Sequence, residues 1–249
     1  MKEMKYSVIM AYYNRANQLY NTLGSFDFHY HDRHDYEVII AVDEKTVNDE
    51  LEYNSFKTVV NCFNINMDIK VVETDYKNCW NPAPLFCDAV DKSEGKFLIL
   101  TNPEVFHKSD IMGALDMEFR LSNHIYVVCA CENAIFDKYY EHVQDVSAFV
   151  YKHLSWYQHS EHRNRMLHFC TAISRKNYDK IGGFDKRYMY GAGVEDVDFL
   201  EKVKKNGIRI EVRDTMETIH QDHGLAQTII PDYDRLWNIN KNLFSAIHD

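Results

Sequence analysis

The sequence of 249 residues has few prolines and glycines, no long apolar run and no excess of basic residues. Its 4 prolines and 9 glycines leave little room for flexible linkers, which favours one large domain. No stretch of about 18 apolar residues occurs, so we expect no transmembrane helix. With 28 Lys and Arg against 38 Asp and Glu, the net charge is −10, which argues against binding to nucleic acid or to an anionic membrane.

Cysteines with the spacing of a metal site or a disulfide framework are missing as well. None of the 6 cysteines forms a Cys-x-x-Cys pair, and Cys129 and Cys131 lie inside an apolar run. We therefore expect reduced, mostly buried thiols. The first residues lead directly into an apolar segment that is too short for a signal peptide, so the expected location is the cytoplasm.

Strand and helix patterns alternate through the first 130 residues. Short apolar runs predict strands at 6–12, 36–42, 69–73, 96–101 and 125–130. Apolar residues at helical spacing predict helices at 16–26, 51–63, 83–93 and 110–122, and a further one near the end, at 232–247. The alternation indicates an α/β fold with a mostly parallel sheet, whose ligands bind at the carboxyl ends of the strands. The Tyr- and His-rich region 132–168 shows no clear periodicity.

The most informative segment combines two glycine-containing turns with three acids. It runs from Gly182-Gly183-Phe184-Asp185 to Glu195-Asp196-Val197-Asp198, and a helix is expected from about Glu195 to Gly207. Acids at a helix N-terminus often only complement the helix dipole. Here glycines precede them, so the backbone could approach a ligand closely, and a carboxylate could accept a proton from a bound hydroxyl.

Two weaker features contain candidate metal ligands. Asn102-Pro103-Glu104 follows a predicted strand and offers two oxygen ligands of the kind that Mg²⁺ and Mn²⁺ prefer, although in isolation an ordinary Asn-Pro turn is the better interpretation. His220 and His223 could meet on one face of a helix, or one of them could be a ligand in a loop. A lone histidine, however, is more often an ordinary surface or core residue.

Four blocks of the sequence together resemble glycosyltransferase family 2, whose members are inverting enzymes with the GT-A fold. The blocks occur in the family's order at 8–15 (V-I-M-A-Y-Y-N-R), 39–43 (I-I-A-V-D), 95–104 (G-K-F-L-I-L-T-N-P-E) and 182–198. The last block is the specific one, and the resemblance covers residues 6 to about 225. It implies a GT-A, Rossmann-like domain over 1–225, with a nucleotide-binding half over about 1–130 and an acceptor-binding half over about 131–225. A C-terminal helical extension over 226–249 would follow.

The resemblance implies roles for individual residues of the donor side. Glu104, with Asn102, would hold the Mn²⁺ or Mg²⁺ that bridges the diphosphate. His220 would be a further metal ligand, with His223 as the alternative. The residues implied to bind the nucleotide are Tyr13, Asn14, Arg15, Asp43 and Asn102.

The acceptor side has its own implied residues. Asp196 would be the catalytic base, and Glu195 would help to bind the acceptor. Gly193 is a candidate acceptor contact in the glycine loop. Trp156 and Tyr157 could stack on a sugar ring, although aromatic residues that fill a core are an equally good interpretation.

The implied activity is that of an inverting hexosyltransferase that moves a sugar from a nucleoside-diphosphate sugar, with a UDP-sugar favoured, to a hydroxyl of a glycan or other acceptor. Asn102-Pro103-Glu104 stands where the family has Asp-x-Asp, so one anionic ligand is lost.

Two other classes of protein stay open. One is a non-catalytic relative that binds a sugar nucleotide or a glycan, against which the intact acids Glu195 and Asp196 argue. The other is a nucleotidyltransferase, which would need a Gly-rich, basic phosphate loop after the first strand. The C-terminal helix could pack on the domain, join copies of the chain as a homo-oligomer or lie on a membrane, although its acids and few basic residues argue against a membrane.

Overall fold

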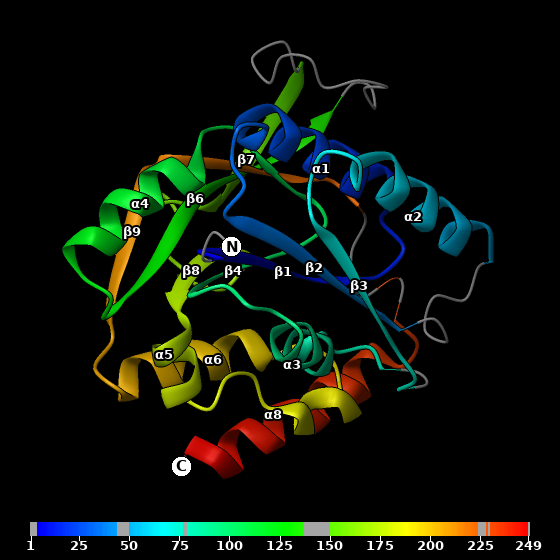
Figure 1. Cartoon of the computed structure of the whole chain (residues 1–249). Coiled ribbons are helices and arrows are strands. Elements are labelled where there is room, and N and C mark those ends of the chain that lie inside the picture. The colour runs from blue at the N-terminus through cyan, green and yellow to red at the C-terminus, as the bar shows by residue number, and fades with distance from the viewer. Residues whose placement is uncertain are drawn as a thin grey trace.

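Helices cover both faces of one curved sheet in the computed structural model, which is shown in Figure 1. The structure describes residues 4–43, 50–76, 79–136, 150–223, 228 and 230–248. On one face lie α1 (Ala16–Tyr30), α2 (Glu50–Phe63) and α4 (Ile111–Leu121). On the other face lie α3 (Ala83–Asp91), α5 (Arg175–Lys180), η2 (Lys186–Tyr190), α6 (Glu195–Lys205) and α8 (Tyr233–His248). Within these ranges, no helix is both long and apolar enough to cross a membrane.

The first half of the sheet is parallel, as the sequence predicts. It has the order β3 (Ile69–Thr74), β2 (Tyr36–Asp43), β1 (Tyr6–Tyr12) and β4 (Phe97–Thr101). Every residue of β2 and β4 is buried, because helices cover both faces of this part of the sheet. The carboxyl ends of these four strands therefore meet along one edge, where ligands bind in open α/β sheets.

In the second half of the sheet the sequence analysis predicted only one strand, at 125–130, which is the start of β6. Next to β4 come β8 (Cys170–Ser174), β6 (Ile125–Phe136), β9 (Arg209–Gln221) and β5 (Val105–His107), while β7 (Tyr151–Gln158) pairs with β6. Strand β8 is antiparallel to both β4 and β6, and β9 is parallel to β6. It follows that β9 runs in the same direction as β4, so its carboxyl end lies at the ligand-binding edge.

The predicted C-terminal helix is present as α8 and packs on its own chain. Asn240 of this helix is fully buried, and His248 contacts Asp198 of α6. Of the placements considered from sequence, packing on the domain is the one that the structure shows. A contact between copies of the chain stays a prediction.

Candidate active site

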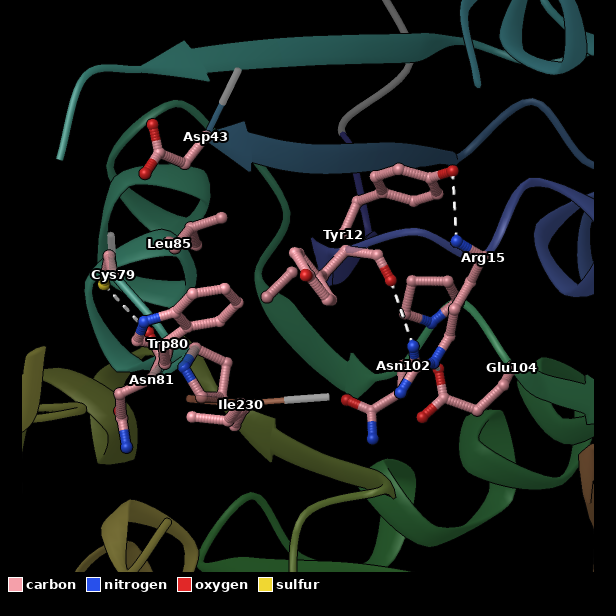
Figure 2. A pocket seen from close by; sticks show the side chains of 14 residues that line it. Tyr12, Arg15, Asp43, Cys79, Trp80, Asn81, Leu85, Asn102, Glu104 and Ile230 are labelled. Carbon is pink, nitrogen blue, oxygen red and sulfur yellow. Dashed lines mark hydrogen bonds and ion pairs between the residues drawn. The ribbon is translucent and has the colours of Figure 1, made fainter. Parts of the chain in front are cut away.

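A cavity of about 200 Å³ opens at the carboxyl ends of β1, β2 and β4. Figure 2 shows Asp43, Trp80 and Leu85 on one side of it and Arg15, Asn102 and Glu104 on the other. The lining residues are Ala11, Tyr12, Tyr13, Arg15, Asp43, Cys79, Trp80, Asn81, Pro82, Leu85, Asn102, Pro103, Glu104 and Ile230. Of the residues predicted to bind a nucleotide, this set contains Tyr13, Arg15, Asp43 and Asn102.

The side of the cavity near β2 is apolar and aromatic, with one carboxylate. Asp43 ends β2 and is 1% exposed, and Leu85 of α3 is buried nearby. The ring of Trp80 meets that of Tyr13 edge to face, with centroids 5.6 Å apart and an angle of 78° between the planes. Such walls suit the flat face of a nucleobase, while a carboxylate accepts hydrogen bonds from the N–H groups at its edge.

Asn14 does not line the cavity, although the sequence analysis placed it among the nucleotide-binding residues. Its side chain is exposed, and its backbone has a φ of 44°, in the left-handed region. Asn tolerates that conformation better than most residues. Asn14 therefore shapes the turn between β1 and α1, which leaves the neighbouring Tyr13 and Arg15 facing the cavity.

Three candidate metal ligands meet on the other side of the cavity. Glu104 Oε1 lies 3.7 Å from His220 Nε2 and 3.4 Å from His223 Nε2, and the two ring nitrogens are 3.2 Å apart. The sequence offered one histidine or the other, whereas the structure brings both to Glu104. One carboxylate and two imidazoles form a donor set that suits a divalent transition-metal ion, so these residues fit a metal site.

The strand pairing explains why residues so distant in the sequence meet here. Strand β5 is antiparallel to β9, and Val105 is the register partner of His220. Glu104 directly precedes β5, so its side chain lies beside His220 at the carboxyl end of β9. The ring of Tyr157 stacks on His220 with centroids 4.5 Å apart and an angle of 9°, which fixes the orientation of the imidazole.

Arg15 supplies a positive charge to this group. Its Nε lies 3.1 Å from Glu104 Oε2, and its Nη2 donates to His223 Nδ1 over 3.0 Å. Burial by itself would raise the pKa of Glu104, but Arg15 and the two histidines outweigh it and hold that pKa well below its usual range. Burial lowers the pKa of His220 to about 4, so its ring is neutral near pH 7, as a metal ligand must be.

A second group of acids lies at the start of α6. Glu195 is buried, and its Oε2 accepts a hydrogen bond of 2.7 Å from Nδ2 of Asn81, which lines the cavity. Burial, and then the charge of Asp196, raise the pKa of Glu195 to about 8, and burial also raises the pKa of Asp196. The two carboxyls interact, and the more deeply buried Glu195 is the one that favours the protonated form.

The third acid of this segment has a structural role. Asp198 is fully buried, forms an ion pair of 2.7 Å with Lys202 and lies 2.8 Å from His248 Nε2. Its charge is therefore neutralised within the fold. Among the three acids, Asp196 is the one that is partly exposed.

Comparisons with known proteins bear on this arrangement. Residues 156–223 match the family described as the N-terminal domain of galactosyltransferase. Residues 1–349 of S. aureus TarS, in complex with UDP-GlcNAc, superpose with a TM-score of 0.62 at 16% identity, covering 90% of this chain and 61% of that chain. A mannosyltransferase from Pyrobaculum calidifontis, in complex with GDP-Man and Mn²⁺, gives a TM-score of 0.59 at 13% identity, covering 86% and 56%. The chain has the GT-A fold.

The similarity to these GT-A proteins lies in the fold and not in close sequence identity. A comparison with curated protein sequences gives no match. The chain spans about 60% of the length of the TarS fragment and less of full TarS, of which it covers 38%. The segment matched by the galactosyltransferase family contains Glu195, Asp196, His220 and His223.

The aromatic residues predicted to bind the acceptor lie apart in this GT-A domain. Trp156 packs against His159 and His162, with ring centroids 4.3 and 5.8 Å away, whereas Tyr157 packs against His220. The pairing of β7 with β6 shifts register at this point, with Trp156 opposite Glu132 and Gln158 opposite Cys131, so the two aromatic rings contact different groups. Burial raises the pKa of Tyr157 to about 12, and the charges of Glu104 and Asp196 add to the effect.

Sequence analysis missed several residues of this site. Trp80 and Asn81 precede α3 and were not considered, although a Trp-Asn-Pro segment before a helix was a visible signal. Ile230 was missed as well, and it lines the cavity from the segment before α8. Each belongs to the site through a long-range contact that local periodicity does not reveal.

Glu195 gives a testable pH dependence of stability. Its pKa in the folded chain lies above the ordinary value of 4.5, so the folded chain retains a proton that the unfolded chain releases. The stabilisation is complete below about pH 4.5 and is lost as the pH rises to about 8, by about 1.4 kcal/mol per pH unit. We expect Glu195→Gln, which mimics the protonated acid, to show a smaller fall of the urea midpoint than the wild type between about pH 5 and 8. Equal slopes would mean that Glu195 is ionised in the folded chain.

Proposed function

We propose that this chain is an inverting, metal-dependent glycosyltransferase of family 2. It would move a sugar from a nucleoside-diphosphate sugar, with a UDP-sugar favoured, to a hydroxyl of a glycan or other acceptor. The observation that carries the proposal is the meeting of Glu104, His220 and His223 at a cavity whose opposite side holds Asp43 and Trp80. In a nucleoside diphosphate bound in this cavity, the base would contact the side with Asp43 and Trp80, and the diphosphate would lie on the side with the candidate metal ligands.

The metal-binding side suits the diphosphate. A Mn²⁺ or Mg²⁺ ion held by Glu104, His220 and His223 would neutralise the charge that builds up on the leaving diphosphate. Arg15, whose guanidinium contacts Glu104 and His223, places a further positive charge at the same end. Asn102 lines the cavity beside Glu104 and offers a neutral oxygen in place of the carboxylate that the family has there.

The acids at the start of α6 supply the other half of the proposed reaction. Asp196 would accept the proton of the acceptor hydroxyl as its oxygen attacks the anomeric carbon and the bond to the diphosphate breaks. Glu195, protonated and held by Asn81, would bind the acceptor beside it. The bound UDP-GlcNAc of the TarS structure supports the choice of a UDP-sugar, and the Mn²⁺ of the mannosyltransferase supports the metal.

A thermal-shift experiment tests the donor and the metal together. We expect UDP with Mn²⁺ to raise the melting temperature more than GDP, CDP or dTDP, because UDP is the favoured nucleotide. At about 100 times its Kd, a ligand adds roughly 2.7 kcal/mol, which is several degrees at this chain length. Two imidazoles favour Mn²⁺ over Mg²⁺, so the shift should be smaller with Mg²⁺.

The result of this experiment also distinguishes the proposed enzyme from the alternative functions. A shift that is independent of the metal would place the metal site elsewhere, and no shift with any nucleotide would contradict the donor assignment. Binding of a UDP-sugar without transfer to any acceptor would indicate a non-catalytic relative instead.

A further inference from the structure

The C-terminal helix α8 lies against η2 and the loop that leads into α6 (Figure 1). Asn240 is the buried residue of this helix, with an exposed fraction of 0%. Its Nδ2 donates hydrogen bonds of 3.0 Å to the carbonyl oxygen of Tyr188 and 2.9 Å to that of Gly193. The amide of one side chain thus joins η2 to the loop before the acids.

The glycines of this loop serve the contact with α8. A Cβ atom added at Gly191 would overlap Asn240 Oδ1 and the carbonyl oxygen of Leu236, and one added at Gly193 would overlap the ring of Trp237. The N–H of Ala192 also donates to the carbonyl oxygen of Leu236 over 3.1 Å. The sequence analysis assigned these glycines to the close approach of a ligand. The structure instead places a helix of the same chain against them.

The loop is held from the cavity side as well. The carbonyl oxygen of Gly193 accepts a second hydrogen bond, of 3.1 Å, from Asn81 Nδ2, which also donates to Glu195. Asn81 Oδ1 in turn accepts from the N–H of Ala83, so the amide is fixed at the start of α3. One carbonyl therefore connects α8 to the wall of the cavity and to the buried acid.

A contact near the end of α8 completes the attachment. His248 Nε2 lies 2.8 Å from Asp198 Oδ1, in the first turn of α6. Helix α8 therefore contacts both the loop before the acids and the helix that carries them.

We propose that α8 is a positioning element of the active site, in which Asn240 holds the Gly193 carbonyl and through it the orientation of Glu195 and Asp196. This role rests on the proposed function, in which these two acids meet the acceptor. Asn240 touches neither the cavity nor the acids, so it acts through Gly193 and Asn81. A loosened loop would leave the nucleotide site in place and misplace the acids.

A loosened loop would change the pKa of Glu195, because that pKa depends on the groups around its carboxyl. The titratable groups that influence it or respond to it are Asp196 and Asp198 on α6, Tyr233 at the start of α8, and Cys79 before α3. Burial is the largest cause of its raised pKa. Water admitted beside the loop would therefore lower the pKa of Glu195 toward its ordinary value.

The test compares Asn240→Ala with Asn242→Ala in the full chain. Asn242 lies on the exposed face of the same helix, so its variant controls for the loss of an amide from α8. We expect Asn240→Ala to lower kcat by about 10-fold or more, because small displacements of catalytic groups are costly, and to leave the Kd for UDP with Mn²⁺ unchanged. In ¹³C NMR titrations, assigned with Glu195→Gln, the pKa of Glu195 should fall in Asn240→Ala and stay unchanged in Asn242→Ala.

A second variant covers the case in which Asn240→Ala fails to fold. Gly191 has φ −138° and ψ −161°, an extended conformation that alanine adopts, and the three atoms nearest to an added Cβ all belong to α8, so Gly191→Ala disturbs the contact with α8. It should lower kcat and the pKa of Glu195 in the same way. Wild-type kcat and an unchanged Glu195 pKa in the folded variants would overturn the proposal. If the wild-type chain transfers no sugar, the proposed function fails, and the Glu195 titration by itself decides the positioning role.

Discussion

Replacing Asp196 by Asn is expected to lower the rate of sugar transfer by about 100- to 10,000-fold, the usual contribution of a general base. The amide has nearly the shape of the carboxylate but cannot accept the proton of the acceptor hydroxyl. Asp196 does not line the nucleotide cavity, so the Kd for UDP should stay at its wild-type value. The measurements are single-turnover transfer from a radiolabelled UDP-sugar and calorimetric titration with UDP.

Asp179→Asn is the matched control for this substitution. Asp179 is an exposed acid on α5, so its variant makes the same chemical change away from the site. Transfer at the wild-type rate by Asp196→Asn would remove Asp196 as the base. Loss of UDP binding in the same variant would instead give Asp196 a role in holding the donor site together.

The second large effect is expected from Glu104→Ala, which removes the single carboxylate among the three candidate metal ligands. We expect the affinity for Mn²⁺ to fall by at least about 100-fold, more than the loss of a supporting contact would cause. The positive charge of Arg15 would then be left without its carboxylate partner, which opposes cation binding further. Titration of Mn²⁺ followed by electron paramagnetic resonance measures the affinity, and the thermal shift by UDP should lose its dependence on Mn²⁺.

Glu161→Gln provides the comparison for Glu104, because Glu161 is an exposed acid in the turn after β7. Its Mn²⁺ affinity should equal that of the wild type. Circular dichroism establishes that Glu104→Ala is folded, and Glu104→Gln keeps the volume of the side chain if the alanine variant is unstable. Unchanged Mn²⁺ binding in a folded Glu104 variant would rule out this metal site.

The parallel half of the sheet was predictable because its signals are local. Strands such as β2 and β4 are buried on both faces, so their sequences are continuous apolar runs. In the helices between the strands, apolar residues recur every three or four positions. The beginning of α6 at Glu195 and the glycine Gly207 after its end were also predicted from the sequence.

In the other half of the sheet the start of β6 was predicted, at 125–130, but β5, β7, β8 and β9 were missed, for physical reasons that can be named. Strand β9 alternates apolar and charged residues only at its start, and a register shift opposite Cys129 and Ala130 then breaks the alternation. Strand β5 has three residues, too few for any period. The orientation of Trp156 depends on register shifts in the pairing of β6 with β7, which no local pattern reveals.

The sequence by itself determined the α/β class and the order of the first strands and helices, and it supplied most of the candidate site residues, from Asp43 to Asp196. These follow from local periodicity and from motifs whose residues are close together in the chain. Only the tertiary structure decided that both His220 and His223 join Glu104, because that meeting depends on the register of β5 against β9. It also decided that α8 packs against Gly191 and Gly193. A contact between segments so far apart in the sequence depends on how the whole domain packs.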